Sequence, residues 1–257
     1  MNLAGLEEAL ENVPGSKAAL ILNFPNNPTG YSPTVEEADK VVAILERLAK
    51  KGKKILAIMD DAYFGLFYEP GTCTESLFGK LADLHENILA AKVDGATKEE
   101  LAWGFRVGFV TYGGKGLTEE QYESLVKKTM GAVRSSISNS NVTGQNLVLR
   151  GMKDPAYKAE KEAVLDILHK RYAKVREVLA QYPADAPLKV LPFNSGYFMT
   201  FECDCDPEKL RLRLLDTYGI GTISIPAKYL RIAFSSVEVE EIEDLYQTIL
   251  KAAREVM

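Results

Sequence analysis

Two side chains near the middle of the sequence could together act on an aldehyde that carries a phosphate group. Lys98 follows a short apolar run, AAKV, and Arg106 stands eight positions later, directly before a second apolar run, VGFVTY. A lysine amine can condense with an aldehyde, and an arginine guanidinium can bind two phosphate oxygens in its fork geometry. Taken alone, Lys98 has a simpler explanation, because a lysine in a run such as TKEE is most often a solvated residue at the start of a helix.

The elements that must position these groups alternate between strand and helix in the first half of the chain. Short apolar runs bounded by loop residues occur at positions 18–24, 54–60, 87–94 and 107–113. Helical patterns separate the first three runs, whereas residues 99–105 are too few for a full helix before the fourth. This alternation predicts an α/β fold with a mainly parallel sheet covered on both faces. Catalytic groups of such sheets lie in loops at the carboxyl ends of the strands.

The helix predicted between the first two strands is the most clearly delimited element. Its apolar residues recur at helical spacing, at Val41, Val42, Ile44, Leu45 and Leu48. Ser32 or Thr34 can cap its amino end, and Gly52 can end it. A shorter helical stretch is expected at residues 74–85, before the third strand.

The second half of the chain follows a different pattern. Helical segments at 117–133 and 146–152 flank a polar interruption. A long helix follows, whose apolar stripe comprises Val164, Leu165, Ile167, Leu168, Tyr172 and Val175. The runs LKVLPF, YFMTFEC and YLRIAFS then read as short strands, with helices that start at Pro207 and Val239. This part of the sequence predicts a small α+β domain.

Composition and charge exclude several classes of protein. A formal net charge of −5 gives no basic surface for nucleic acid. No apolar run is long enough to cross a membrane, and the first residues lack the basic and apolar regions of a signal peptide. Three cysteines make no even disulfide framework, and with only two histidines no metal-ligand set appears. These features predict a protein of a reducing compartment, the cytoplasm, without a metal site.

Polar groups stand at the end or start of each of the four predicted strands. PNNPTG at residues 25–30 follows the first strand and DDAY at 60–63 follows the second, while Lys98 follows the third and Arg106 opens the fourth. Pyridoxal phosphate needs an amine for its aldehyde, a carboxylate beside its pyridine nitrogen, donors to its phenolate oxygen and a cation for its phosphate. The four sites together predict a pocket for this cofactor.

These motifs carry a family resemblance. NPTG at residues 27–30, D-x-A-Y at 60–63, the lysine at 98 and R-x-G at 106–108 occur in this order, each at a strand boundary. In these features the chain resembles the fold-type I pyridoxal-phosphate enzymes, specifically the class I/II aminotransferases. The spacing of eight residues between the lysine and the arginine also matches that family, and the resemblance covers essentially all 257 residues.

The resemblance implies three contacts with the cofactor ring. Asn27 and Tyr63 would donate hydrogen bonds to the phenolate oxygen, and Asp60 would pair with the pyridinium nitrogen. Each also has a purely structural alternative. The Asn27-Pro28 dipeptide is a turn signal, Asp60 or Asp61 could cap the following segment, and Tyr63 could be an aromatic residue at the edge of the core.

The resemblance assigns roles to four further residues. Lys98 would form the covalent bond with the cofactor aldehyde and move the α-proton of the substrate. Arg106 would bind the phosphate, with a hydroxyl from Thr97, and Arg231 would bind the α-carboxylate of the substrate. As structural alternatives, Arg106 could pair with a glutamate of the TKEE run on the surface, and Arg231 could be an ordinary strand arginine.

The same resemblance implies the architecture. A partial doubly wound, mainly parallel sheet would be followed by a long connecting helix and a small C-terminal α+β domain. Residues 1–152 would be part of the large cofactor-binding domain. Residues 153–257 would form the connecting helix and the small domain.

The activity that the resemblance implies is the transfer of an amino group between an amino acid and a 2-oxo acid, by a homodimer with pyridoxal 5'-phosphate. Two other functions stay open. A carbon–sulfur lyase or decarboxylase of the same fold would use the same cofactor residues. A ligand-sensing domain of a regulator would keep the fold without turnover.

The chain departs from the family pattern at two places. Gly95, in the GAT run before Lys98, cannot offer the phosphate a hydroxyl where the family often shows serines. The chain also corresponds to the C-terminal portion of the family and lacks the N-terminal segment that supplies the first strands, a phosphate-binding helix end and an aromatic residue that stacks on the ring. We therefore expect a sheet with an uncovered edge, and a polypeptide that by itself binds the cofactor weakly or not at all and does not transaminate.

Overall fold

The computed structural model describes residues 1–226 and 228–257. The described chain forms two compact units, each with its own hydrophobic core. The first unit comprises residues 1–24, 33–65 and 70–157, and the second comprises residues 25–32, 66–69 and 158–257. Two short loops from the first half of the chain, 25–32 and 66–69, thus belong to the second unit. The predicted assignment of cofactor binding to residues 1–152 concerns function and stays a prediction.

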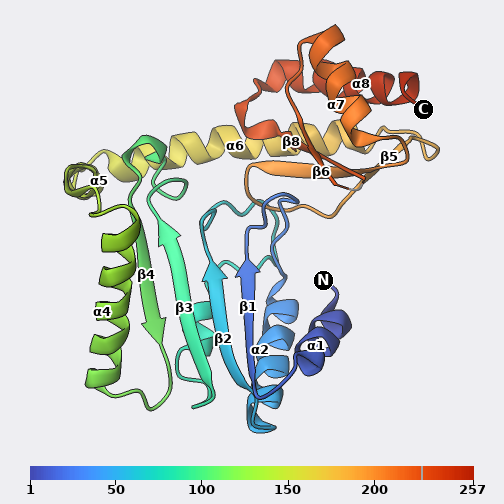
Figure 1. Ribbon diagram of the computed structural model, residues 1–257. Coiled ribbons are helices and arrows are strands. Elements are labelled where there is room, and N and C mark those ends of the chain that lie inside the picture. Colours follow the sequence, from blue (N-terminus) through green and yellow to red (C-terminus); the bar gives the residue numbers. More distant parts are fainter. Residues whose placement is uncertain (227) are drawn as a thin grey trace. The chain divides into compact units, whose positions relative to one another are not determined.

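The first unit is built on a four-stranded sheet (Figure 1). Its strands lie in sequence order and are β1 (Lys17–Asn23), β2 (Lys54–Asp60), β3 (Ile88–Gly95) and β4 (Gly108–Gly113). The first three pair in parallel and β4 is antiparallel to β3, which confirms the prediction of a mainly parallel sheet. The carboxyl ends align, because Asn23 pairs with Asp60 and Asp60 with Val93. Groups that follow β1, β2 and β3 therefore start from one edge of the sheet.

Three helices accompany the parallel strands, α1 (Leu3–Asn12), α2 (Val35–Lys50) and α3 (Leu77–Leu81). Thr34 caps α2 in a reciprocal capping box with Glu37, and Gly52 lies just beyond its end with φ +92°. Four of the five predicted apolar positions of α2 are buried and Val42 is half-buried. The shorter helix was predicted too long at both ends: residues 74–85 were expected, whereas Ser76 caps α3 and the helix ends at Leu81. The sequence analysis did not predict α1.

The opposite face of the sheet is less covered than predicted. Alternate side chains of β1 are buried at Ala18 and Leu22, whereas Ile21 is 67% exposed. Strands with parallel neighbours normally bury both faces. Among the described residues, β1 and β4 are the outer strands of the sheet, which agrees with the expected uncovered edge.

Two helices follow β4, namely α4 (Glu119–Ser136) and α5 (Val142–Met152). The hydroxyls of Tyr112 on β4 and Thr129 on α4 are hydrogen-bonded at 2.7 Å. None of the α4 residues is fully buried, and Met130 is 64% exposed. A helix with exposed apolar side chains of this kind presents a surface for association.

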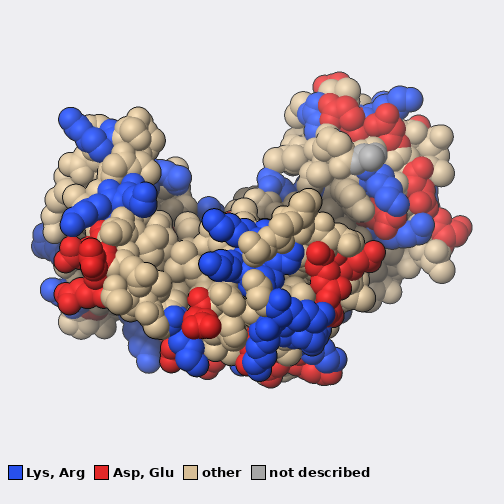
Figure 2. All heavy atoms as spheres, turned by 60° about the horizontal axis from the view of Figure 1, so that its bottom comes forward, with Lys and Arg blue, Asp and Glu red and all other residues tan. Residues whose placement is uncertain are grey.

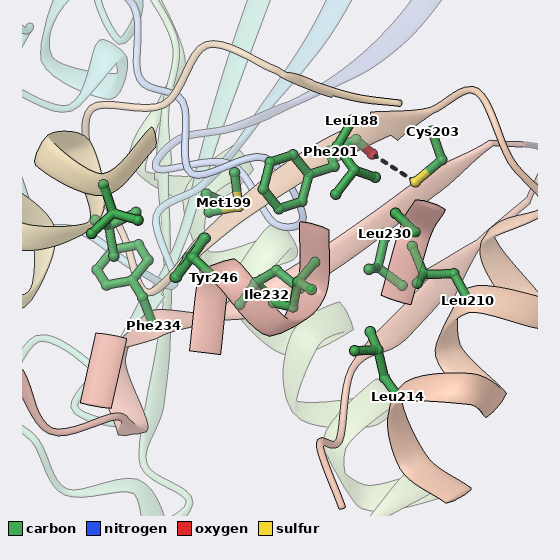
Figure 3. Close-up of a cluster of buried hydrophobic side chains, with 14 of the residues drawn as sticks. Leu188, Met199, Phe201, Cys203, Leu210, Leu214, Leu230, Ile232, Phe234 and Tyr246 are labelled. Atoms are coloured by element: carbon green, nitrogen blue, oxygen red, sulfur yellow. Dashed lines mark hydrogen bonds between the residues drawn. The ribbon is translucent and has the colours of Figure 1, made fainter. Parts of the chain in front are cut away.

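The second unit is an α+β structure, as predicted for the end of the chain. Its antiparallel sheet has the order β5-β6-β8-β7. The elements are α6 (Tyr157–Leu179), β5 (Leu188–Val190), β6 (Phe198–Cys203), α7 (Pro207–Tyr218), β7 (Ile223–Ile225), β8 (Tyr229–Ala233) and α8 (Val239–Glu255). Side chains of β6, β8 and α8, among them Phe201, Leu230 and Tyr246, form its core (Figure 3). The three-residue β7 was not predicted.

The long helix α6 confirms the predicted helix but only part of its apolar stripe. Tyr172 and Val175 are buried in the core of the second unit, and Leu168 is also buried, while Val164 and Ile167 are exposed. The stripe was wrong in its first two turns because periodicity marks an apolar face without showing whether another element covers it. No helix of the described residues is long and apolar enough to cross a membrane.

Candidate functional site

A cavity of about 320 Å³ lies at the carboxyl ends of the parallel strands of the first unit. Thr97, Lys98 and Arg106 all line it, together with backbone and side chains from the ends of β3 and β4. Three of the predicted cofactor residues thus line one cavity. A cation and a hydroxyl beside an amine form a suitable environment for a phosphorylated aldehyde.

The surroundings of Lys98 lower its pKa. Burial lowers its pKa, and the nearby positive charge of Arg106 lowers it further. Its Nζ lies 4.9 Å from the ring centroid of Tyr63, a cation–π contact. Nζ has no hydrogen-bond or ion-pair partner in the described part of the chain. More of this lysine is therefore neutral at a given pH than of an exposed one.

The guanidinium of Arg106 forms no ion pair with a described carboxylate. It follows the short 3-10 helix η1 (Trp103–Phe105) with a left-handed backbone, φ +52°, and its Nη1 donates to the carbonyl of Trp103 at 3.3 Å. No described carboxylate pairs with it, so the alternative of a surface ion pair with a glutamate of the TKEE run is wrong. Its remaining donors stay available for an anion.

Gly95, the departure from the family pattern, has a packing reason. A Cβ at this position would lie 2.5 Å from the carbonyl oxygen of Val107. Gly95 pairs with Gly108 across β3 and β4, and the backbone N–H of Ala96 donates to Val107 at 3.2 Å. The two strands pass too closely for a serine at this position.

Asp60 ends β2, next to the strand that leads to Lys98. Its Oδ2 accepts a hydrogen bond from Nδ2 of Asn23 at 3.0 Å, and its Oδ1 accepts one from the backbone N–H of Ala62 at 3.3 Å. The second bond is the local cap that the structural alternative expected, and the two roles are compatible because a carboxylate accepts several bonds. Asp60 does not line the cavity of Lys98.

The adjacent Asp61 is part of a charged cluster that the sequence analysis did not identify. Asp61 is 5% exposed, and its Oδ2 has no hydrogen-bond partner in the described residues. Burial raises its pKa, although the Ser76 hydroxyl and the Lys92 charge act against this. Lys92 lies 4.0 Å from Asp61 and forms a closer ion pair with Asp94. In the sequence, this cluster was indicated by Lys92 alone, a lysine within the apolar run of β3.

In the second unit, the structure brings Asn27 and Arg231 together. Nη1 of Arg231 donates to Oδ1 of Asn27 at 2.9 Å, and the guanidinium lies 4.2 Å from the ring centroid of Phe198. Thr200, the partner of Arg231 across β6 and β8, donates to the carbonyl of Pro28 at 2.8 Å. An arginine held on one side by an amide and stacked on a ring keeps donors for a carboxylate.

The loop that carries Asn27 is held by buried polar groups. Asn194 accepts from the backbone N–H of Ser32 at 2.8 Å and donates to its carbonyl at 2.9 Å. Gly30 has φ +75°, and a Cβ there would lie 2.0 Å from the carbonyl oxygen of Phe198. The Asn27-Pro28 peptide bond is cis. The sequence analysis missed this anchor, although the N-S-G run at residues 194–196 is itself a turn signal.

The seven predicted site residues therefore fall into two groups. Tyr63, Thr97, Lys98 and Arg106 gather in the first unit, with Asp60 at the end of the neighbouring strand. Asn27 and Arg231 meet in the second unit. That both groups serve one pocket stays a prediction.

A second cavity of about 610 Å³ lies at the opposite, amino ends of the strands. Basic side chains of the first unit gather near this end of the sheet, close to acidic ones (Figure 2). Lys17, Lys54, Lys115 and Lys128 line the cavity, and none of the four has a carboxylate within 4 Å among the described residues. No predicted site residue lines it, so the chemistry is assigned to the carboxyl ends.

Two relatives of the chain are aminotransferases by name. The chain is 24% identical over 261 residues to a probable aspartate/prephenate aminotransferase of Aquifex aeolicus, covering 98% of this chain and 61% of that protein. It is 26% identical over 256 residues to an aspartate aminotransferase of Thermotoga maritima, covering 93% and 59%. The chain thus spans about three-fifths of the length of the curated relatives that it matches.

Solved structures agree with this likeness. An aminotransferase from Anaerococcus prevotii superposes with a TM-score of 0.83 at 25% identity, covering 100% of this chain and 61% of that chain. An aromatic aminotransferase from Pyrococcus horikoshii has the same fold, with a TM-score of 0.75 at 18% identity. The model of the family described as aminotransferase class I and II matches residues 1–249. With its motifs in family order and this match over nearly its whole length, the chain is a member of the class I and II aminotransferases.

Proposed function

We propose that this chain is part of an aminotransferase that moves an amino group between an amino acid and a 2-oxo acid with pyridoxal 5'-phosphate. One observation carries the proposal. Lys98, an amine whose pKa is lowered by burial and by Arg106, lies in the same cavity as that arginine and the hydroxyl of Thr97. The family of the chain supports the same function.

The residues present fit this cofactor. Arg106 has no carboxylate partner and Thr97 has no hydrogen bond from its hydroxyl in the described part of the chain, so both could bind phosphate oxygens. When bound, the cofactor supplies an aldehyde that bonds to amines and a ring that accepts electrons from a neighbouring carbon. Asp60 would keep the ring nitrogen protonated, and Asn27 and Tyr63 would donate to the phenolate oxygen.

The chain's own residues would then act on the substrate. Lys98, whose pKa is lowered, would in its neutral form take a proton from the α-carbon and return it at the other end of the reacting system. Arg231, fixed by Asn27 and stacked on Phe198, would bind the α-carboxylate and orient the substrate. Amino acids and 2-oxo acids share this carboxylate, which suits a site that serves both halves of the reaction.

Selective labelling of Lys98 tests the cofactor assignment. The polypeptide is incubated with excess pyridoxal phosphate, reduced with borohydride and digested, and the labelled lysines are mapped by mass spectrometry. We expect label at Lys98 well above every other lysine, lost in Lys98→Ala and retained in the control Lys128→Ala, an exposed lysine outside the cavity. Uniform labelling of all lysines would contradict the proposal.

Retention and turnover are tested separately. We expect the 257-residue polypeptide to lose the cofactor on dialysis and to form no 2-oxo acid by itself, because relatives of which it spans three-fifths have further parts. An aminotransferase assay reads 2-oxo acid and the new amino acid, whereas release of carbon dioxide would indicate a decarboxylase. We further propose a homodimer, supported by the exposed apolar residues of α4, and a cytoplasmic location, supported by three free cysteines among the described residues.

A further inference from the structure

Two acidic side chains lie at the carboxyl ends of β2 and β3, beside the cavity of Lys98. Asp94 lines that cavity, and its side chain is 17% exposed. The side chain of Asp61 is 5% exposed, and its backbone N–H donates to the carbonyl of Val93, the neighbour of Asp94, at 2.9 Å. Negative charge at this place opposes the binding of an anion such as a phosphate group.

Lys92 offsets this negative charge. Residues 92 and 94 are two apart on β3, so their side chains leave the strand on the same side. The ammonium of Lys92 forms an ion pair with Asp94, and its Nζ lies 4.0 Å from Oδ2 of Asp61. No other cation of the described residues is ion-paired to either carboxylate. One half-buried lysine thus serves both acids.

The ion pair between Lys92 and Asp94 also bears on Arg106. Arg106 and Asp94 line the same cavity, yet the guanidinium forms no ion pair with a described carboxylate. Lys98 reacts as an amine only in its neutral form, so Arg106 is then the one cation among the described residues that line the cavity. If Lys92 did not pair with Asp94, the carboxylate would offset the positive charge of Arg106.

A purely structural role of Lys92 would concern Asp61 alone. Asp61 is buried and does not line the cavity, so a cation near it relieves the burial of a charge without affecting a ligand. The closer of the two ion pairs, however, is the one with Asp94. Lys92 therefore pairs most closely with the acid that an anion in the cavity would meet.

We propose that Lys92 is a positioning residue of the candidate cofactor site: it keeps Asp94 paired and so leaves the guanidinium of Arg106 available for the phosphate of the cofactor. The inference rests on the proposed function, in which Arg106 and Thr97 bind that phosphate. Lys92 does not line the cavity, so it acts through Asp94 and touches neither cofactor nor substrate.

Two aldehydes that differ only in the phosphate group test this role. Lys98 is labelled with pyridoxal phosphate or with pyridoxal over a concentration series, reduced with borohydride and quantified by peptide mass spectrometry. In Lys92→Met we expect the half-saturating concentration of pyridoxal phosphate to rise about tenfold, while that of pyridoxal stays near its wild-type value. A loss of packing would raise both concentrations, so their ratio separates an effect of charge from an effect of structure.

Matched variants sharpen the comparison. Lys80→Met removes an ion-paired lysine of the same unit outside the cavity, and Lys92→Arg keeps the positive charge, so both should keep the wild-type ratio. Lys92→Met combined with Asp94→Asn removes both members of the pair and should restore the ratio. Asp94→Asn alone should lower the half-saturating concentration of pyridoxal phosphate below the wild-type value. A loss of stability cannot produce that result, so the test holds even where Lys92→Met does not fold.

The proposal is overturned if folded Lys92→Met changes both half-saturating concentrations by the same factor, or if Asp94→Asn leaves that of pyridoxal phosphate unchanged. Failure of the proposed function would look different, because pyridoxal phosphate would then label Lys98 of the wild-type chain no more than its other lysines.

Discussion

At the scale of single residues, burial changes the chemistry of charged groups in the first unit. Lys98 and Asp61 both lie near the carboxyl ends of the strands. Burial lowers the pKa of Lys98 and raises the pKa of Asp61, and both shifts favour the neutral form of the side chain. The consequences of the two shifts differ. A neutral lysine is a reactive amine, whereas a buried carboxylate oxygen without a hydrogen bond lowers the stability of the fold.

The lowered pKa of Lys98 predicts an early titration of its reactivity. Reductive methylation with formaldehyde requires a neutral amine, so Lys98 should react at a lower pH in the folded protein than in the protein unfolded by urea. Quantitative peptide mass spectrometry across pH 6–11, about the range in which lysines titrate, measures both midpoints. In folded Arg106→Met the Lys98 midpoint should rise, because a nearby positive charge is lost. Equal Lys98 midpoints in the folded and the unfolded protein would contradict the geometry of the cavity.

Asp61 predicts a pH dependence of stability. Its pKa is raised in the folded state, so the folded protein binds the proton more tightly than the unfolded one, and the stability that Asp61 contributes falls as pH rises above about 4. Asp61→Asn removes this charge while Lys92 keeps Asp94 as a partner. In urea unfolding, the free energy of unfolding of Asp61→Asn relative to that of wild type should therefore increase from about pH 4 to pH 7.

The exposed Asp83 provides the control for that comparison. Asp83→Asn should track wild type at each pH, because its carboxyl is exposed and has no ion pair in the described residues. If Asp61→Asn also tracked wild type, the buried carboxyl would carry no penalty.

At the scale of elements, the loop at residues 25–32 depends on distant partners. Asn194 satisfies both backbone groups of Ser32, and the hydroxyl of Ser195 donates to the carbonyl of Gly30 at 3.1 Å. Arg231 and Thr200 hold the two residues at the loop's tip, Asn27 and Pro28. The orientation of a proposed substrate-binding pair thus rests on hydrogen bonds that span more than a hundred residues of sequence.

Removal of this anchor should be costly. Asn194→Ala leaves the buried N–H and C=O of Ser32 without partners, and the free energy of unfolding should fall by about 2–4 kcal/mol. In Asn194→Asp the side chain still accepts a hydrogen bond, but it can donate one only when the carboxyl is protonated. This variant should therefore be less destabilised than Asn194→Ala at low pH and about equally destabilised at neutral pH. The midpoint of urea unfolding measures both. Asn139 lies on the surface, so the free energy of unfolding of Asn139→Ala should stay within about 0.5 kcal/mol of the wild-type value. If Asn139→Ala lost as much stability as Asn194→Ala, the anchor would have no special role.

At the scale of the whole molecule, the sheet of the first unit exposes apolar side chains that other elements normally bury. Ile21 on β1 is 67% exposed, and Phe109 and Val110 on β4 are 52% and 45% exposed. Both strands are outer strands of the sheet in the described residues. Outer strands with exposed apolar side chains tend to associate with other chains.

The polypeptide should therefore self-associate through this surface. Sedimentation velocity over a concentration series should show a sedimentation coefficient that rises with concentration in wild type and rises less in Ile21→Lys. Leu212→Lys places the same charge on an exposed residue of α7 in the second unit and should behave like wild type. Equal effects of the two lysine substitutions would show that net charge, and not β1, controls association.

The amino-acid sequence by itself determined the local elements and the order of the motifs. The helix α2 was predicted from its apolar repeat and its cap because both are local properties, and β2 was predicted with its observed limits for the same reason. The motifs at Asp60, Lys98 and Arg106 were found because each follows or opens a strand, and the family match agrees with them.

Only the tertiary structure decided which of these residues meet and which faces are covered. It placed Arg106 in the cavity of Lys98 with no ion pair to a described carboxylate, joined Asn27 to Arg231 across the sequence, buried Asp61, and left Val164 exposed. It also explained Gly95, through a backbone that passes too close for a side chain. The physical reason is common to all of these. Burial, pKa and steric fit depend on atoms distant in sequence, and periodicity or local propensity holds no information about them.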